Sequence, residues 1–272
     1  ALTAPIILEG CSVEIGASIG IALAPDHGAD GSTLLRHADV AMYVAKRGRQ
    51  GYAVYAPAQD AHSPTQLTLT SELRQAIAQD QLRLHYQPVV NLGSGRPVSM
   101  EALVRWAHPV HGLLAPDQFL PLATDTGLIV PLTLWVLEAA LRQGQAWHQA
   151  GIPLGLSVNL PARVLDDATL PHTIASLLQR HAVAPERLTL EITESALMTH
   201  HAQVREALGC LRASGVRIAI DDFGTGHSSL SLLQHLPVDE IKIDRSFVAG
   251  ATTEDTTIAI VCTIMGLAHI LD

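Results

Sequence analysis

The feature that most constrains the fold is an alternation of short apolar strands with amphipathic helices through the second half of the chain. Strands are predicted at 98–104, 154–160, 187–193, 216–222 and 239–244. Helical spacing is found at 116–124, 129–150, 169–182, 200–214, 228–235 and 254–270. Repeated β/α units of this kind indicate parallel strands, in either an open doubly wound sheet or a closed barrel.

Each predicted strand has one apolar and one polar face, because successive side chains point to opposite sides of a strand. A charged or metal-capable residue stands late on every polar face: Glu101, Asn159, Glu191, Asp221 and Lys242. If the aliphatic faces pack on outer helices, these side chains point inward to the carboxyl-terminal mouth of one barrel. Asp222 directly follows Asp221. Because of this adjacent carboxylate, Asp221 is the natural residue to bridge two ions.

Carboxylates gathered in this way cannot all stay ionised without hard divalent cations, and oxygen ligands favour Mg²⁺ or Mn²⁺ over zinc. Two such ions could activate a water and neutralise a phosphodiester for in-line hydrolysis.

Composition excludes several classes of protein. The net charge is −9 and no run of Lys or Arg offsets it, which argues against a nucleic-acid polymer as partner. A hydrophobic content of 48% suffices for a core, yet every apolar run is broken before the roughly 20 residues of a membrane span. We therefore expect a soluble segment without membrane contact, although an upstream domain could anchor the full-length protein. The three cysteines are isolated and odd in number, which favours the cytoplasm.

The first 56 residues read as a separate unit, with a strand at 12–24, a helix from Ser32 to Gly48 and a strand at 50–55. The Gly16-x-Ser18-x-Gly20 pattern lacks the sharp turn of a nucleophile elbow, since the strand pattern continues through it. The run SIGIALAPDHGADGSTLLRHADVAMYVAKRGRQGYAVY resembles the carboxyl-terminal part of a GGDEF diguanylate cyclase domain. The signature loop of that family would precede residue 1, so the resemblance implies no cyclase activity from this chain. Residues 57–66 have the composition of a linker.

Six motifs follow one another along residues 67–272: YQPVV at 86–90, MEALVRW at 100–106, SVNL at 157–160, LEITES at 190–195, DDFGTG at 221–226 and IKIDRSFV at 241–248. Together they resemble the motifs of the EAL family of cyclic di-GMP phosphodiesterases. The resemblance implies a TIM-like barrel that hydrolyses cyclic di-GMP to linear pGpG with two Mg²⁺ or Mn²⁺ ions.

The resemblance also assigns roles to single residues. The implied metal ligands are Glu101, Asn159, Glu191, Asp221 and Asp222. Lys242, with Glu101, would be catalytic by positioning or helping to deprotonate the attacking water. Gln87, Leu103 and Arg105 match positions that contact the dinucleotide, and Glu194 matches the residue that anchors the DDFGTG loop. The family also implies a homodimer through the EAL domain.

His227 and Pro161 depart from the residues usual at their motif positions. The family continues past the helix that ends near Asp272, with a strand that carries a further metal-site Glu and with one more strand. We therefore expect an incomplete barrel that lacks its last two strands, and impaired hydrolysis by residues 1–272 alone. A non-catalytic cyclic di-GMP receptor is the alternative function.

Overall fold

The computed structural model describes residues 6–8, 11–13, 17–47, 51–57, 63–197, 201–224, 237–250 and 255–271. The chain forms two compact units, Ala1–Glu72 and Leu73–Asp272, which are described separately. Among the described residues, no helix is both long and apolar enough to cross a membrane.

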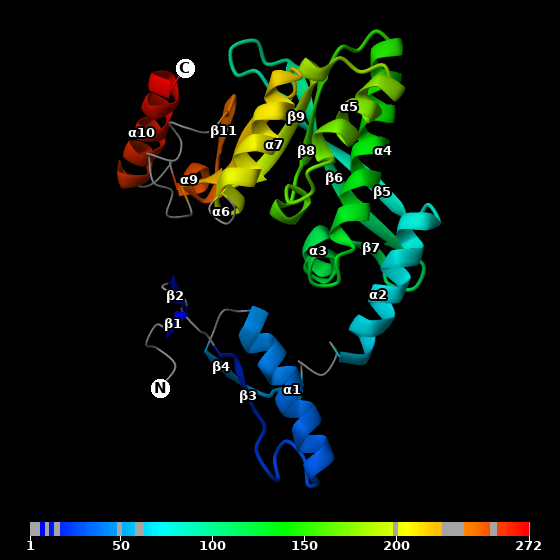
Figure 1. Cartoon of the computed structure of the whole chain (residues 1–272), viewed down its shortest axis with the longest axis vertical. Coiled ribbons are helices and arrows are strands. Elements are labelled where there is room, and N and C mark those ends of the chain that lie inside the picture. The colour runs from blue at the N-terminus through cyan, green and yellow to red at the C-terminus, as the bar shows by residue number, and fades with distance from the viewer. Residues whose placement is uncertain are drawn as a thin grey trace. The chain divides into compact units, whose positions relative to one another are not determined.

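In the first unit, one helix packs on a pair of parallel strands. Helix α1 (Gly31–Arg47) contacts both β3 (Ile19–Ile21) and β4 (Tyr52–Val54) (Figure 1). A Cβ atom on Gly20 would lie 1.8 Å from the carbonyl oxygen of Ala38, so this close approach of strand and helix requires glycine. Gly20 thus serves helix packing, and no nucleophile elbow forms around it. The Asp30 carboxylate accepts the amide hydrogen of Thr33 at 2.9 Å, which starts the helix one residue before the predicted Ser32.

The predicted single strand at 12–24 is wrong. Strand β2 (Cys11–Val13) pairs antiparallel with β1 (Ile6–Leu8), whereas β3 pairs with β4. A turn then follows, in which the amide of Leu23 donates to Nδ1 of His27 at 3.0 Å and the amide of His27 donates back to the Leu23 carbonyl at 2.7 Å. This turn takes up the backbone groups that a longer strand would need for pairing.

Helix α2 (Ser63–Ala78) begins inside the stretch 57–66 that was predicted as a linker. Pro64 lies in its first turn, where a missing amide hydrogen costs no helical hydrogen bond. The end of the helix belongs to the second unit, in which Leu73 and Ala76 are fully buried.

The second unit is built on one mixed sheet. Its strands are β5 (Leu82–Val90), β6 (Pro97–His108), β7 (Gly112–Leu114), β8 (Gly155–Asn159), β9 (Leu188–Thr193), β10 (Arg217–Phe223) and β11 (Glu240–Ile243). The order is β11-β10-β9-β8-β6-β5, and β7 pairs with β6. Strands β6, β8, β9, β10 and β11 are mutually parallel, and β5 forms an antiparallel hairpin with β6.

The predicted parallel β/α architecture is therefore confirmed. Within the described residues, β5 and β11 are the edges of this sheet and do not meet, so the barrel is incomplete.

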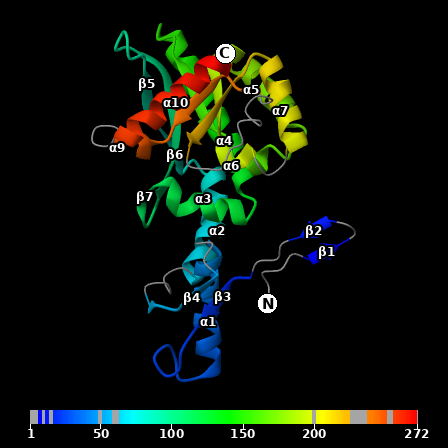
Figure 2. The same ribbon diagram turned by 90° about the vertical axis from the view of Figure 1, so that its left-hand side faces the viewer.

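Helices cover the outer face of the sheet. The principal ones are α3 (Pro116–Asp125), α4 (Ile129–Gln149), α5 (Leu170–Arg180), α7 (His201–Ala213) and α10 (Asp255–Leu271). Short helices lie at η2 (Ala162–Val164), η3 (Pro185–Arg187), α6 (Glu194–Leu197) and α9 (Arg245–Gly250). Helices α4, α5 and α7 run side by side, and α10 packs near the edge strand β11 (Figures 1 and 2). The helix predicted at 228–235 lies outside the described residues.

Packing of strand β6 against the helices determines which of its side chains face the candidate site. Ala102, Val104 and Trp106 are buried toward the helices, whereas the intervening Leu103 and Arg105 are half-buried on the opposite face. The ring of Trp106 meets that of Phe119 from α3 edge to face at 5.8 Å. This packing fixes which face of the strand looks inward, and Glu101 stands on that inward face with Leu103.

Candidate active site

One ammonium and three carboxylates from four strands form the centre of the candidate site. Nζ of Lys242 on β11 lies 3.0 Å from Oε2 of Glu101, 2.6 Å from Oε2 of Glu191 and 3.4 Å from Oδ1 of Asp221. We call these four residues the Lys242 cluster. The sequence predicted that these side chains share the inward face of neighbouring strands, and the structure brings all four together.

Asn159 extends the cluster. Its side-chain amide donates to Oε1 of Glu101 at 3.1 Å, and its backbone lies opposite Glu191 in the pairing of β8 with β9. Glu101 is therefore held at both carboxylate oxygens, one by Asn159 and the other by Lys242. A carboxylate fixed at both oxygens has little rotational freedom left, so its direction is set before any ligand arrives.

A β-bulge places the paired aspartates. Between Ile220 and Phe223 the register of β10 against β11 shifts, so that Asp221 and Asp222 together oppose Lys242. Asp222 has a φ of 54°, which is uncommon for a residue other than glycine. The bulge breaks the strict alternation that would send Asp222 to the face opposite Asp221.

Asp222 has a second carboxyl neighbour, Asp244, which is not a member of the Lys242 cluster. The two carboxyl groups share a side-chain hydrogen bond. Burial, together with the negative charges of Asp221 and Asp244, raises the pKa of Asp222 above its ordinary value. The pKa of Asp244 is lowered, first by the side chain and then by the backbone of Ser246, which both donate to it.

The electrostatics of the cluster follow from burial. Glu191 is only 2% exposed, and its burial, reinforced by Glu101 and Asp221, raises its pKa to about 7 even though Lys242 opposes the shift. Burial acts to lower the pKa of Lys242, but the hydrogen bonds and charges of Glu191 and Glu101 outweigh it and leave that pKa above its ordinary value. Lys242 is therefore a permanent cation beside Glu191, whose burial makes that carboxyl group harder to ionise.

The donor set of the site fits a hard divalent cation. Three carboxylates and one amide converge from neighbouring strands, and oxygen donors of this kind suit Mg²⁺ and Mn²⁺. In the part of the chain that the structure describes, no group of three Asp, Glu, His or Cys side chains is arranged around a common metal position. The carboxylates close on Lys242 instead, which supplies the positive charge between them.

Glu194 lies where the DDFGTG motif leaves strand β10. Its Oε2 accepts the amide hydrogen of Gly224 at 3.0 Å, and its side chain is buried. A Cβ atom on Gly224, which has a φ of 99°, would lie 2.9 Å from the ring of Phe247. The first turn of the motif is thus fixed by a charged acceptor and by tight packing, while the residues from 225 to 236 lie outside the described part.

The three predicted substrate residues line the inward face of the β5–β6 hairpin but do not join the Lys242 cluster. Gln87 pairs directly opposite Glu101 across the two strands and is exposed. Leu103 and Arg105 follow Glu101 on the same face, and the guanidinium of Arg105 donates to the carbonyl of Val104 at 2.8 Å. The structure therefore places Gln87 beside a cluster member and the other two farther along β6.

A cavity of about 460 Å³ adjoins the cluster at the ends of the parallel strands. Leu103, Asn159, Glu191 and Thr193 border it from the sheet. Apolar side chains of α3 and α4 form its other wall, among them Leu120, Ile129, Leu132 and Val136. Polar groups thus stand at one side of a largely apolar hollow, as is usual for sites that bind organic ligands.

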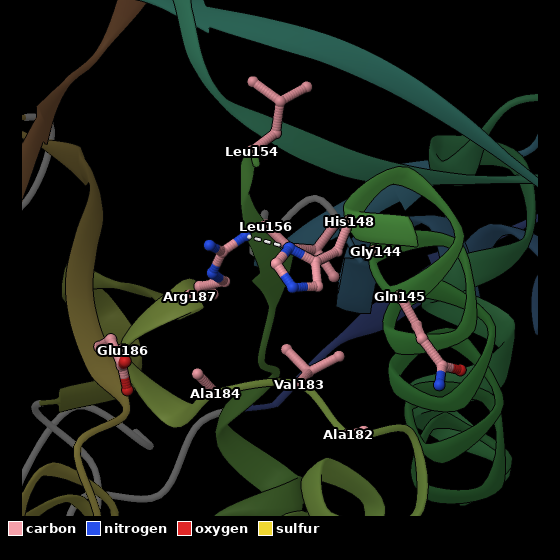
Figure 3. Close-up of a pocket in the computed structure, with 10 residues that line it drawn as sticks. All are labelled: Gly144, Gln145, His148, Leu154, Leu156, Ala182, Val183, Ala184, Glu186 and Arg187. Carbon is pink, nitrogen blue, oxygen red and sulfur yellow. Dashed lines mark hydrogen bonds between the residues drawn. The ribbon is translucent and has the colours of Figure 1, made fainter. Parts of the chain in front are cut away.

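A second cavity, of about 190 Å³, lies near the starts of β8 and β9 (Figure 3). His148 and Arg187 face each other across it, with 3.3 Å between Nδ1 and Nη1. None of the cluster residues lines this cavity. In barrels of parallel strands, chemistry belongs to the carboxyl-terminal ends of the strands, so we assign the site to the Lys242 cluster.

Two residues near the site were not selected from the sequence. Asp244 directly follows β11, and it shares a side-chain hydrogen bond with Asp222 beside the bulge of β10. Thr193 pairs opposite Asp221 and borders the cavity. Strand parity could have found both, whereas the contact of Asp244 with Asp222 lies beside a register shift that alternation does not predict.

Comparison with known families agrees with this geometry. Residues 70–272 match the model of the EAL domain, and residues 1–51 match that of the diguanylate cyclase GGDEF domain. The chain is 44% identical over 273 residues to the bifunctional diguanylate cyclase/cyclic di-GMP phosphodiesterase MucR of Pseudomonas aeruginosa. It is 38% identical over 272 residues to the cyclic di-GMP phosphodiesterase PdeR of Escherichia coli. All of this chain is covered in both matches, and it spans 40% and 41% of the two relatives.

A solved structure described as "PaMucR Phosphodiesterase, c-di-GMP complex" superimposes with a TM-score of 0.71 at 45% sequence identity. The match covers 75% of this chain and 83% of that one. The sequence motifs, the open and mostly parallel sheet and these matches agree, and the chain belongs to the EAL domain family, with a short segment of a GGDEF domain ahead of its EAL domain.

Proposed function

We propose that this chain is the phosphodiesterase part of a cyclic di-GMP signalling protein, and that the natural protein hydrolyses cyclic di-GMP to linear pGpG. The convergence of Glu101, Glu191 and Asp221 on Lys242 carries the proposal. Relatives named as cyclic di-GMP phosphodiesterases and a related structure in complex with cyclic di-GMP support the choice of substrate.

In this proposal the oxygen donors of the site hold two divalent cations, Mg²⁺ or Mn²⁺. The proposed ligands are Glu101, Asn159, Glu191, Asp221 and Asp222. When bound, the ions would lower the pKa of a water molecule and neutralise the phosphodiester. The carboxyl group of Asp222 shares a hydrogen bond with that of Asp244, and a bound ion would compete with this contact.

The remaining steps belong to the chain's own side chains. Lys242 stands within hydrogen-bond distance of two carboxylates, a position from which it can orient a water molecule near them or take part in its proton transfer. Gln87, Leu103 and Arg105 contact the dinucleotide, and Arg105 supplies positive charge for a phosphate in an otherwise acidic protein. The neighbouring cavity gives room for apolar contacts with a base.

Two further parts of the proposal concern the assembly and its compartment. We place the chain in a homodimer formed through the EAL domain, with Glu194 tying the DDFGTG loop to the site. Light scattering of the purified protein measures its molar mass in solution, which distinguishes a dimer from a monomer. We also place it in the cytoplasm, where its three cysteines would remain reduced.

The test is the release of pGpG from cyclic di-GMP by the natural protein with Mn²⁺ or Mg²⁺, followed by anion-exchange chromatography. Metal-dependent release that Glu101→Gln abolishes supports the proposal. Cyclic di-GMP that binds but is recovered intact in the presence of both metals rejects it and favours a non-catalytic receptor.

A further inference from the structure

The chain contains only two lysines, Lys46 and Lys242, whereas its other basic side chains, apart from histidine, are arginines. One of the two stands at the centre of the candidate site. An ammonium is a compact point charge with three donors, whereas a guanidinium is a planar fork. The difference matters here because the three acidic partners come from three different strands.

The contacts of Lys242 involve the same oxygens that the proposed function assigns to metal ions. Oε2 of Glu101 and Oε2 of Glu191 both accept from Nζ, at 3.0 and 2.6 Å. Oδ1 of Asp221 lies 3.4 Å from the same atom. A cation bound by these oxygens would therefore lie close to the ammonium, and two like charges at such a distance in a partly buried site repel each other strongly.

Without any cation, the cluster would be difficult to hold together. Glu191 is 2% exposed, and Glu101 and Asp221 add negative charge from the neighbouring strands. A buried charge that loses its partner is strongly destabilising. Lys242 is the one basic side chain that an ion pair joins to these three carboxylates within the described residues.

We propose that Lys242 is a resident counter-cation, which holds Glu101, Glu191 and Asp221 together before metal arrives and competes with divalent ions for their oxygens. This inference rests on the proposed function for the identity of the ions. Because coupling between two sites is reciprocal, metal binding must loosen the contacts of Lys242 by as much as those contacts weaken metal binding. Lys242 is then a positioning residue for the empty state as well as a participant in turnover.

The first experiment measures Mn²⁺ binding to the metal-free whole chain by titration calorimetry, without cyclic di-GMP. Lys242→Met keeps the length of the stem and removes the charge, and we expect it to bind Mn²⁺ about tenfold more tightly than the wild type. We expect its metal-free form to unfold at a lower temperature than the wild type, and saturating Mn²⁺ to close that gap. Lys242→Arg keeps a cation in a different shape, so its Mn²⁺ affinity should lie between those of the wild type and Lys242→Met. Lys46→Met, in helix α1, is the matched control and should change neither quantity.

Wild-type or weaker Mn²⁺ affinity in Lys242→Met overturns the inference. A variant that gains affinity while the wild type leaves cyclic di-GMP uncut overturns the proposed function and leaves the inference standing. If the wild type hydrolyses cyclic di-GMP but Lys242→Met gains no Mn²⁺ affinity, the proposed function stands and the inference about Lys242 fails. Failure of the proposed function and failure of the inference are therefore distinguishable.

A second experiment uses the scarcity of lysine. The whole chain is treated with a lysine-selective acylating reagent, and mass spectrometry follows the modification of Lys46 and Lys242 separately. Because an ammonium held by carboxylates is shielded from the reagent, we expect Mg²⁺ to speed the modification of Lys242 several-fold and to leave Lys46 unchanged. An unchanged or slower rate at Lys242, under conditions in which calorimetry shows bound Mg²⁺, contradicts the inference.

Discussion

The side chains of Lys242 and Glu191 meet at 2.6 Å although the residues are 51 positions apart in the sequence. The partnership links the edge strand β11 to the buried strand β9 across β10. It keeps a positive charge beside a carboxylate whose burial disfavours ionisation. The chemistry that we propose depends on this contact, and four predictions follow from it and from its surroundings.

Replacement of Lys242 should affect turnover more than substrate binding. We expect Lys242→Met to lower kcat for cyclic di-GMP by about 100-fold or more, since a side chain engaged in proton transfer or water positioning contributes on that order. Binding of cyclic di-GMP, measured by calorimetry, should change far less. Lys46→Met provides the control. A variant with wild-type kcat would remove Lys242 from the catalytic machinery.

The metal-free protein should lose stability as the pH rises through the range in which Glu191 ionises. The pKa of Glu191 is raised from 4.5 to about 7 in the fold, so between these values the folded chain binds more protons than the unfolded chain. Its contribution to the free energy of unfolding is thus fully present below pH 4.5 and is lost as the pH passes 7. Urea unfolding in EDTA at pH 5 and pH 8 measures the difference.

Glu191→Gln is the control for this pH dependence, because it cannot ionise. Its difference in stability between the two pH values should be smaller than that of the wild type. Equal pH dependence in the two proteins would show that Glu191 has an ordinary pKa.

Substitutions of two neighbouring residues on β9 should have opposite effects, one on stability and the other on activity. Leu190 is fully buried toward the helices, so Leu190→Ala should cost about 2–5 kcal/mol in the free energy of unfolding. The activity of each folded molecule should survive. Glu191→Gln should instead abolish turnover with a much smaller loss of stability. Denaturant unfolding and kinetic assays on both variants test this, and an inactive but fully stable Leu190→Ala would contradict the assignment of faces.

The anchor between Glu194 and Gly224 should be visible in amide exchange. Glu194→Ala removes the acceptor 3.0 Å from the Gly224 amide, and leaving a partly buried donor without its partner costs about 1–3 kcal/mol. We expect faster hydrogen exchange at Gly224 and reduced turnover. Glu194→Gln retains an acceptor oxygen and should lie between wild type and alanine. Unchanged exchange in Glu194→Ala would mean that other contacts hold this turn.

Strand parity predicted much of the site because the period of two is a local property. It placed Glu101, Glu191, Asp221 and Lys242 on one face, and the packing of Leu190 and Trp106 against helices settles which face that is. Alternating apolar runs likewise predicted the five parallel strands. For most strand ends, the predicted position is within two residues of the observed one.

Contacts that depend on register could not be predicted. The bulge at Asp221 and Asp222 is set by pairing with β11 and follows from no local pattern. The hydrogen bond between Asp222 and Asp244 lies beside that bulge. The strand predicted at 12–24 failed for a similar reason, since a turn closed by His27 competes with an alternating pattern that local sequence alone favours.

The decisive measurement is the fate of cyclic di-GMP on the natural protein in the presence of Mn²⁺, resolved by ³¹P NMR. A phosphodiester opened by hydrolysis gives a terminal phosphate signal that the cyclic substrate lacks. We predict one product, pGpG, whose formation stops on addition of EDTA and is absent in Glu101→Gln. Saturating binding of cyclic di-GMP and Mn²⁺ with no new phosphate signal would contradict the account.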